Sequence, residues 1–315
     1  MFLAARAFVL SLIFCAAPFV EVKASEQSVR LLESYYSLAD EDIDLAGLKL
    51  SVDEIIDPSA SPENTLKLLD EMTARIRVDL PANPTAKQKV AVIRRHIYHA
   101  GEWNDGRPFA YDLDDPLGKN LQNKLLATYF DTRFGNCVSM PILFLIQAER
   151  VGLKVTLSTA PFHIFVKYFD DEMGRYVNLE TTDGANPARD EWIRQNIAMT
   201  DRSIESGIYM RPLSKREVIG VIGTLLLEYH WERGEYREVK AIADLILRQD
   251  QKNIDALVAY GSAAGKQIEA FRTENPDWSA LNLFQRQDFE RLVNENAGAF
   301  AAAEQLGWRP EEAAN

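Results

Sequence analysis

One stretch of this chain, residues 133–182, has the pattern of an apolar helix followed directly by β-strands, and this order constrains the fold most. The helix pattern runs from Cys137 to Val151 and stops before Gly152, a residue type that commonly ends helices. The residues that follow predict three strands, with a turn between the second and the third. The predicted strands are Val155–Ser158, Ile164–Phe169 and Arg175–Thr181, and the predicted turn is Asp170–Gly174.

Most of the remaining chain shows apolar residues at helical spacing. Residues 225–247 have the length of a tetratricopeptide helix–turn–helix unit, although the small-residue pattern of such repeats is incomplete. We therefore predict an α+β protein with N-terminal helices, a core in which the helix bearing Cys137 precedes antiparallel strands, and a C-terminal α-helical repeat-like region. The predicted helical segments are residues 26–78, 87–99, 121–129, 225–247, 257–271 and 284–306, and the predicted domains are residues 25–210 and 211–315.

The first 24 residues have the pattern of a secretory signal peptide. Arg6 supplies the positive charge, an apolar run follows, and small residues up to Ala24 form the expected cleavage site. The apolar run is short for a membrane span, so cleavage and export to the periplasm or the medium are expected, with an uncleaved anchor as the alternative. Cleavage would remove Cys15 and leave Cys137 as a thiol with no disulfide partner.

The charge balance restricts the possible partners. Among 315 residues, 35 are Lys or Arg and 47 are Asp or Glu, which gives a formal net charge of −12. This balance argues against nucleic-acid binding and against adhesion to anionic lipid, because both depend on excess positive charge. We expect a protein or peptide as substrate or partner, and no stable membrane span once the signal is cleaved.

Three residues in the α-then-β stretch are candidates for thiol chemistry. Such chemistry needs a thiolate, an imidazole that exchanges protons with it, and a group that orients the imidazole. Cys137 stands at the predicted start of the apolar helix, whose backbone N–H groups favour a thiolate and can bind an oxyanion. His163 interrupts an apolar strand and Glu180 lies on the returning strand. The candidate triad is Cys137, His163 and Glu180, with Asn178 or Asp183 as alternative groups for orienting the imidazole.

The relation between His163 and Glu180 depends on the strand register. One register pairs Phe169 with Arg175, and His163 then faces Thr181 and only neighbours Glu180. A loop shorter by one residue would place His163 directly opposite Glu180 and on the same face.

A zinc site was the other chemistry to consider. His96 and His99 stand three residues apart on a predicted helix, and Cys137 or His163 would have to complete the site. No CxxC or HExxH motif accompanies them, so a solvated helix face is the better interpretation. We predict neither a metal nor a cofactor.

The residues around the candidate triad resemble the transglutaminase-like superfamily, and within it the SirB1 group most closely. The resemblance covers roughly residues 50–200 and rests on Phe134-Gly135-Asn136-Cys137-Val138-Ser139, on Ala160-Pro161-Phe162-His163-Ile164-Phe165 and on the acid before Thr181-Thr182. It implies a papain-like core with Cys137 as nucleophile, His163 as base and acid, and Glu180 as the third member. Transglutaminases usually have aspartate at that third position.

Together these observations predict an exported thiol-dependent acyl-transfer enzyme, a cysteine peptidase or amidase acting on a protein or peptide amide. The alternative is a binding module with a vestigial Cys137, which would recruit protein partners through its helical C-terminal region.

Overall fold

The computed structural model describes residues 21–116 and 118–310, with side chains from residue 26 onward. Most of the predicted signal peptide, with Cys15, lies outside the described residues. Its last residues form the start of the first helix, α1. Within the described ranges, no helix combines the length and apolar content needed to cross a membrane.

From residue 21 onward, five α-helices precede the candidate nucleophile, largely where apolar spacing predicts them. Local signals set their ends: the Ser61 hydroxyl accepts a hydrogen bond from Asn64 N at the start of α3, and Thr85 forms a capping box with Gln88 at the start of α4. The helices are α1 (Glu21–Tyr36), α2 (Leu45–Ile56), α3 (Pro62–Asp79), α4 (Ala86–Tyr98) and α5 (Leu126–Thr132).

The predicted α-then-β order is confirmed, and the sheet has one strand more than predicted. Helix α6 (Ser139–Arg150) packs against the first two strands of an antiparallel sheet with the order β3-β4-β5-β6. A short parallel pair, β1 with β2, lies just before Cys137 and was not predicted, because two-residue strands carry no periodicity. The strands are β1 (Ala110–Tyr111), β2 (Phe134–Gly135), β3 (Val155–Ala160), β4 (His163–Asp170), β5 (Arg175–Glu180) and β6 (Asn186–Ala188).

Both predicted registers of the β4–β5 hairpin are wrong. Asp170 pairs with Arg175, which makes the turn one residue shorter than the first register requires. Asp170 causes this, because its carboxylate accepts hydrogen bonds from the backbone of Glu172 and Met173 inside the turn, and Gly174 takes a left-handed φ of 63°. The helix and the three predicted strands nevertheless follow one another in the predicted order.

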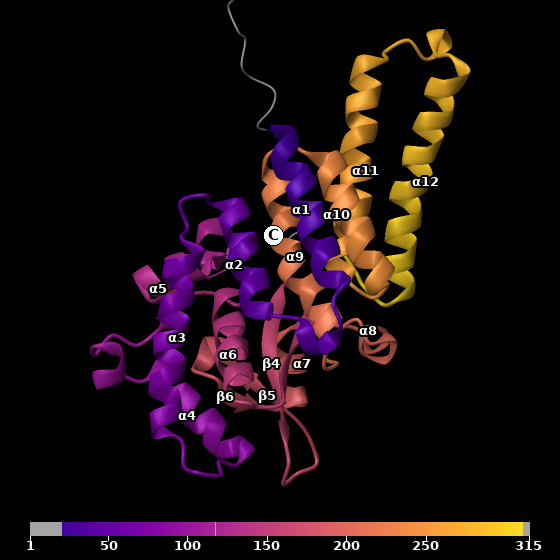
Figure 1. Ribbon diagram of the computed structural model, residues 1–315. Coiled ribbons are helices and arrows are strands. Elements are labelled where there is room, and N and C mark those ends of the chain that lie inside the picture. The colour runs from indigo at the N-terminus through magenta and orange to yellow at the C-terminus, as the bar shows by residue number, and fades with distance from the viewer. Residues whose placement is uncertain (1–20, 117, 311–315) are drawn as a thin grey trace, which may run out of the picture.

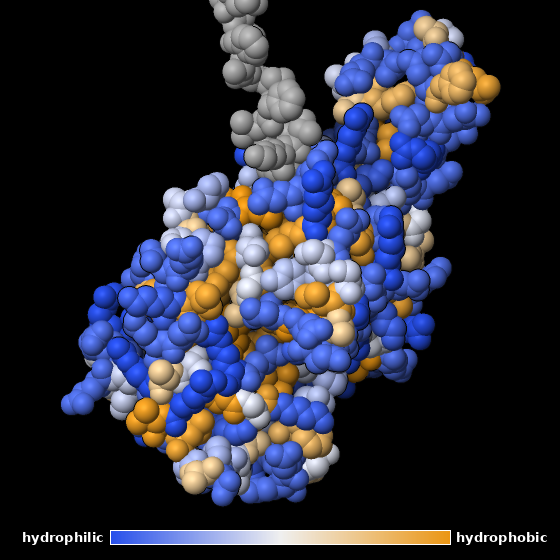
Figure 2. Space-filling model, viewed as in Figure 1, coloured by the Kyte–Doolittle hydropathy of each residue, from blue (hydrophilic) through white to orange (hydrophobic). Residues whose placement is uncertain are grey.

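Six helices follow the sheet. Helices α9 and α10 are joined by a short turn and correspond to the predicted helix–turn–helix, while α11 and α12 form a long antiparallel hairpin that projects from the body (Figure 1). Apolar side chains gather at the outer end of this hairpin (Figure 2), where Trp278, Leu283 and Phe284 are exposed. The helices are α7 (Asp190–Asn196), α8 (Asp201–Ser206), α9 (Lys215–Glu232), α10 (Tyr236–Gln249), α11 (Ile254–Glu274) and α12 (Leu283–Gln305).

The main hydrophobic core joins the N-terminal and C-terminal helices. Leu32 of α1 and Leu48 of α2 belong to the same buried cluster as Ile222 of α9 and Ile246 of α10. Helices α1 and α2 both pack on α9, so the C-terminal helices are held beside the residues that carry the candidate triad. The predicted boundary between residues 210 and 211 stays a prediction.

Candidate functional site

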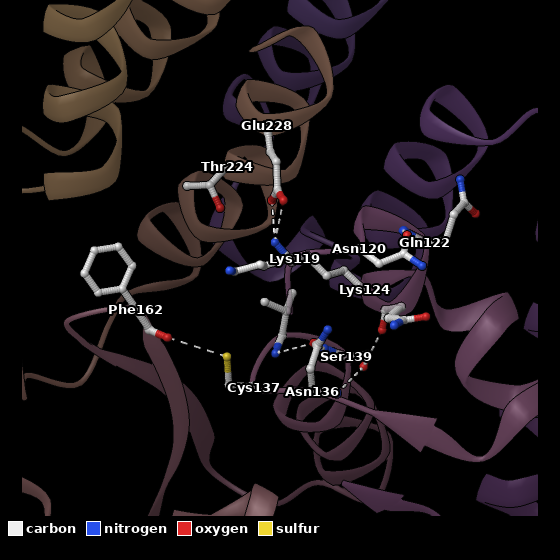
Figure 3. Close-up of polar contacts among 12 residues, drawn as sticks. Lys119, Asn120, Gln122, Lys124, Asn136, Cys137, Ser139, Phe162, Thr224 and Glu228 are labelled. Atoms are coloured by element: carbon white, nitrogen blue, oxygen red, sulfur yellow. Dashed lines mark hydrogen bonds and ion pairs between the residues drawn. The ribbon is translucent and has the colours of Figure 1, made fainter. Parts of the chain in front are cut away.

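Cys137 lies in a turn immediately before α6, and the prediction that it opens the helix is wrong by two residues. The Asn136 side chain is the reason: its Oδ1 accepts hydrogen bonds from Val138 N at 3.0 Å and Ser139 N at 3.2 Å (Figure 3). Two N–H groups expected to be free are therefore occupied. Within residues 21–116 and 118–310, the Cys137 N–H has no hydrogen-bond partner, which leaves it available to an oxyanion.

His163 and Glu180 meet as predicted, although by a different register. Extending the observed pairing by one residue places Phe165 opposite Glu180, so His163 lies on the same face as the carboxylate and diagonally across from it. His163 Nε2 lies 2.7 Å from Glu180 Oε2, and the side chains are 15% and 6% exposed. The other Glu180 oxygen accepts hydrogen bonds from the backbone N–H of Thr182 at 3.0 Å and from its hydroxyl at 2.6 Å, which fixes the carboxylate.

The two alternative orienting groups are engaged elsewhere. The Asn178 Oδ1 accepts a hydrogen bond from Lys167, and its amide nitrogen donates to Ala188 O at 3.0 Å. Asp183 accepts a hydrogen bond from the Asn186 amide at 3.1 Å. The imidazole is therefore oriented by Glu180.

The thiol of Cys137 lies beside this pair. Its Sγ is 3.6 Å from the carbonyl oxygen of Phe162, the residue before His163 (Figure 3). Burial lowers the pKa of His163, but its hydrogen bonds with Cys137 and Glu180 outweigh burial and raise this pKa to about 9. Burial raises the pKa of Glu180, but the hydrogen bond and the charge of His163 have the larger effect. The pKa of Glu180 is therefore lowered overall. Near neutral pH the raised pKa of His163 favours the cationic form of its ring, which lies between the Glu180 carboxylate and the Cys137 sulfur.

Phe162 holds its carbonyl in place through an unusual backbone conformation. Pro161 and Phe162 form the two-residue turn between β3 and β4, since Ala160 pairs with His163. Phe162 has a φ of 54°, in the left-handed region that residues other than glycine seldom adopt, and its side chain is 75% exposed. Such strain is commonly found at functional sites. The sequence carries no signal for it, because Pro-Phe is not a typical left-handed turn pair.

The histidines considered for zinc are arranged differently. The predicted solvated face is wrong for His96, which is buried, lies with its Nε2 2.8 Å from Asp79 Oδ2 and contacts the Trp103 ring. His99 is exposed just after the end of α4. In the part of the chain that the structure describes, no three His, Cys, Asp or Glu side chains are grouped so as to hold a metal ion.

A cavity of about 520 Å³ lies against Cys137 and His163. Helices α9 and α11 form its opposite wall and contribute Glu228 and Asp255. Lys124 Nζ lies 2.7 Å from Glu228 Oε1 across this space (Figure 3). Sequence reasoning missed these residues because the contact joins positions 104 residues apart and no motif marks it.

Another hollow, of about 800 Å³, lies beside Asp112 and Asp115, and neither Cys137 nor His163 lines it. We place the candidate site in the smaller cavity because it contains the thiol and the imidazole.

Gly135 allows Tyr129 to pack beneath the nucleophile. A Cβ at this position would lie 2.5 Å from the Tyr129 ring and 2.7 Å from Ser139 Oγ, and Tyr129 is fully buried. We expect Gly135→Ala to lower the free energy of unfolding by about 1–3 kcal/mol, measured by urea denaturation. The matched control is Gly298→Ala on the exposed face of α12, where a Cβ meets no atom within 4 Å. It should raise stability by about 0.5–1 kcal/mol, and equal effects of the two variants would contradict the packing argument.

Comparisons with known proteins bear on this site to different degrees. No curated protein matches the chain. Among solved structures, the chain is similar to menin, whose crystal structure is described as revealing the binding site for Mixed Lineage Leukemia (MLL) protein. That similarity has a TM-score of 0.38 with 14% identity over 92% of this chain and 84% of menin, which is too weak to bear on fold or function.

The family comparison is more specific. The model described as the transglutaminase-like superfamily matches residues 63–222, just over half of the 315 residues, and this range contains Cys137, His163 and Glu180. The chain therefore belongs to the transglutaminase-like superfamily.

Proposed function

We propose that the protein is an exported, thiol-dependent acyl-transfer enzyme that hydrolyses a protein or peptide amide. Cys137 is the nucleophile, His163 the general base and acid, and Glu180 the residue that orients the imidazole. The observation that carries the proposal is the position of the His163 ring, which contacts the buried Glu180 carboxylate on one side and the Cys137 thiol on the other.

The reaction would proceed in two steps. The Cys137 thiolate attacks the amide carbonyl carbon, and the negative charge that develops on the oxygen is stabilised by the Cys137 N–H. The His163 imidazolium then gives its proton to the departing amine nitrogen as the C–N bond breaks, and a thioester remains on Cys137. In the second step neutral His163 takes a proton from water as the water oxygen attacks the thioester carbon. The C–S bond then breaks and releases the carboxylic acid and the Cys137 thiolate, which restores the starting thiolate and imidazolium. Glu180 stays ionised throughout and holds Nε2 of the ring.

Membership of the superfamily supports cysteine-dependent acyl transfer as the reaction class. We further infer a papain-like core built on α6 and β3–β5, a closest relation to the SirB1 group, and a tetratricopeptide-like role for α9 and α10 in docking the partner. The amino-terminal signal pattern supports export. Hydrolysis is favoured over transfer to an amine because water is the abundant acceptor.

Interception of the thioester tests this function. A peptide library is incubated with the enzyme, with and without hydroxylamine, and the products are analysed by mass spectrometry. We expect cleavage to an acid without hydroxylamine, a hydroxamate with it, and neither with Cys137→Ala. If the wild-type protein gives no cleavage, no hydroxamate and no acyl adduct on Cys137, the binding-module interpretation replaces this proposal.

A further inference from the structure

The cavity beside the triad holds a carboxylate with no partner. Asp255 lines this cavity, and within residues 21–116 and 118–310 it takes part in neither a hydrogen bond nor an ion pair. It also lines a neighbouring cavity of about 630 Å³, which shares Phe162 and Trp308 with the first. Asp255 therefore stands where the two cavities meet, and the thiol lies on the wall of one of them.

Arg309 lines the neighbouring cavity, whereas the charged side chains of the Cys137 cavity leave Asp255 uncompensated there. Besides His163, the charged side chains that line the Cys137 cavity are Lys124, Glu228 and Asp255. Lys124 already contacts both oxygens of Glu228, so its charge is largely compensated. Lys119, which Figure 3 shows next to this pair, is exposed and does not line the cavity.

Asp255 is not needed to cap its own helix. Asn253 caps α11 by accepting a hydrogen bond from Ala256 N at 3.0 Å. The Asp255 carboxylate is reached by solvent through the cavities, yet protein surrounds it, and this enclosure raises its pKa while Lys124 lowers it. A cation that arrives in the cavity lowers the pKa again and so favours the ionised form.

The walls next to Asp255 suit an alkyl chain. Val258 and Ala259 follow it on α11, and Trp231 and Trp308 also line the cavity. Aliphatic and aromatic surface of this kind accommodates the methylene stem of a long basic side chain, whose charged end then reaches a carboxylate.

We propose that Asp255 is a specificity-determining residue that binds a cationic group, an ammonium or guanidinium on an aliphatic stem, carried by the amide substrate that Cys137 attacks. This inference rests on the proposed function, because it assumes that Cys137 attacks an amide substrate. The expected substrates are peptides with a lysine-type or arginine-type side chain near the scissile amide. Asp255 lies outside the residues matched by the family model.

Affinity labelling of Cys137 tests the cation site without requiring turnover. The probes are iodoacetamides N-substituted with an ω-aminoalkyl chain of three to six methylenes, each paired with the neutral n-alkyl iodoacetamide of the same length. Alkylation is quantified on the peptide that contains Cys137, and each rate is divided by the rate with free cysteine. We expect the best cationic probe to react at least about tenfold faster than its neutral partner at low salt, and 1 M KCl to reduce this ratio.

The variants separate a specific site from general charge. Asp255→Asn should bring the ratio to about one, because the carboxylate that attracts the cationic probe is then removed. Glu238→Gln removes the same charge from the first turn of α10, where Glu238 lines another groove, and should keep the wild-type ratio. A wild-type ratio near one, or a ratio unchanged in Asp255→Asn, would overturn the proposal. If Asp255→Asn fails to fold, the wild-type ratio and its salt dependence still show whether the cavity attracts a cation.

A second arm distinguishes this inference from the proposed function. Peptide amides that differ only in lysine or norleucine beside the scissile bond are compared by kcat/KM in the wild-type enzyme and Asp255→Asn. Hydrolysis without a preference for lysine overturns the cation site and leaves the enzyme proposal standing. Selective labelling without any hydrolysis supports the cation site and overturns the enzyme proposal.

Discussion

Replacing Cys137 by alanine should lower the rate of amide hydrolysis by about 10⁴-fold or more, because the covalent route then disappears and only binding and the oxyanion site remain. The measurement is kcat/KM on whichever peptide the library selects. The unfolding transition should change little, since Cys137 is partly exposed and its side chain makes polar contacts only with the His163 ring and, weakly, with the Phe162 carbonyl within the described residues.

The matched control for this variant is Ser262→Ala. Ser262 lines the same cavity on α11, away from the triad, and its loss should change kcat/KM by less than about threefold. If Cys137→Ala keeps activity within tenfold of the wild-type enzyme, Cys137 is not the nucleophile.

The second large effect is expected at His163. His163→Gln should lower kcat/KM by about 10³-fold, because glutamine neither stabilises the thiolate nor protonates the leaving amine. The wild-type rate should fall as pH rises past about 9, where the His163 imidazolium loses its proton. In Glu180→Gln the imidazolium loses its carboxylate partner, so this alkaline fall should move to lower pH. An alkaline limb that stays in place in Glu180→Gln would contradict the role given to that carboxylate.

The same pair should make stability depend on pH. The pKa of His163 is raised in the folded protein from about 6.5, so its stabilising contribution is complete below that pH and is lost as pH rises through about 9. Glu180 has a lowered pKa, so its contribution is present above its ordinary pKa and is lost as pH falls through the lowered one. Urea denaturation from pH 6 to 10 should show the wild-type protein losing stability, by about 3 kcal/mol at most, relative to His163→Gln. Parallel pH profiles for the two proteins would contradict this linkage.

Local patterns predicted much of this fold. The apolar run after Cys137 and the hairpin turn around Asp170–Gly174 depend on residues that are close together in the chain, and such signals can be read from sequence. The two missed details have local causes of another kind. The Asn136 side-chain oxygen accepts hydrogen bonds from the N–H groups of Val138 and Ser139, and Asp170 shortens the hairpin turn by one residue. In each case the same local sequence is compatible with two hydrogen-bonding patterns, so the sequence alone does not decide between them.

The candidate site was predicted only in part for a different reason. Cys137, His163 and Glu180 lie within one short stretch of chain, so their meeting follows from the packing of α6 on the strands that come next. The wall formed by Glu228 and Asp255 depends on how α9 and α11 pack against the sheet, through contacts between positions about a hundred residues apart. Apolar periodicity says which face of each helix is buried, but it does not say against which partner.

The most direct test of the central claim is the pH dependence of Cys137 alkylation by iodoacetamide. Only the thiolate reacts, so the rate follows its population. In the wild-type protein, where a cationic His163 lies beside the thiol, the rate at pH 6 should stay within about tenfold of the rate at pH 9. In His163→Gln the same ratio should fall more than about a hundredfold, as for an ordinary cysteine. Equal profiles for the two proteins would show that Cys137 and His163 form no ion pair, and the enzyme proposal would fail with it.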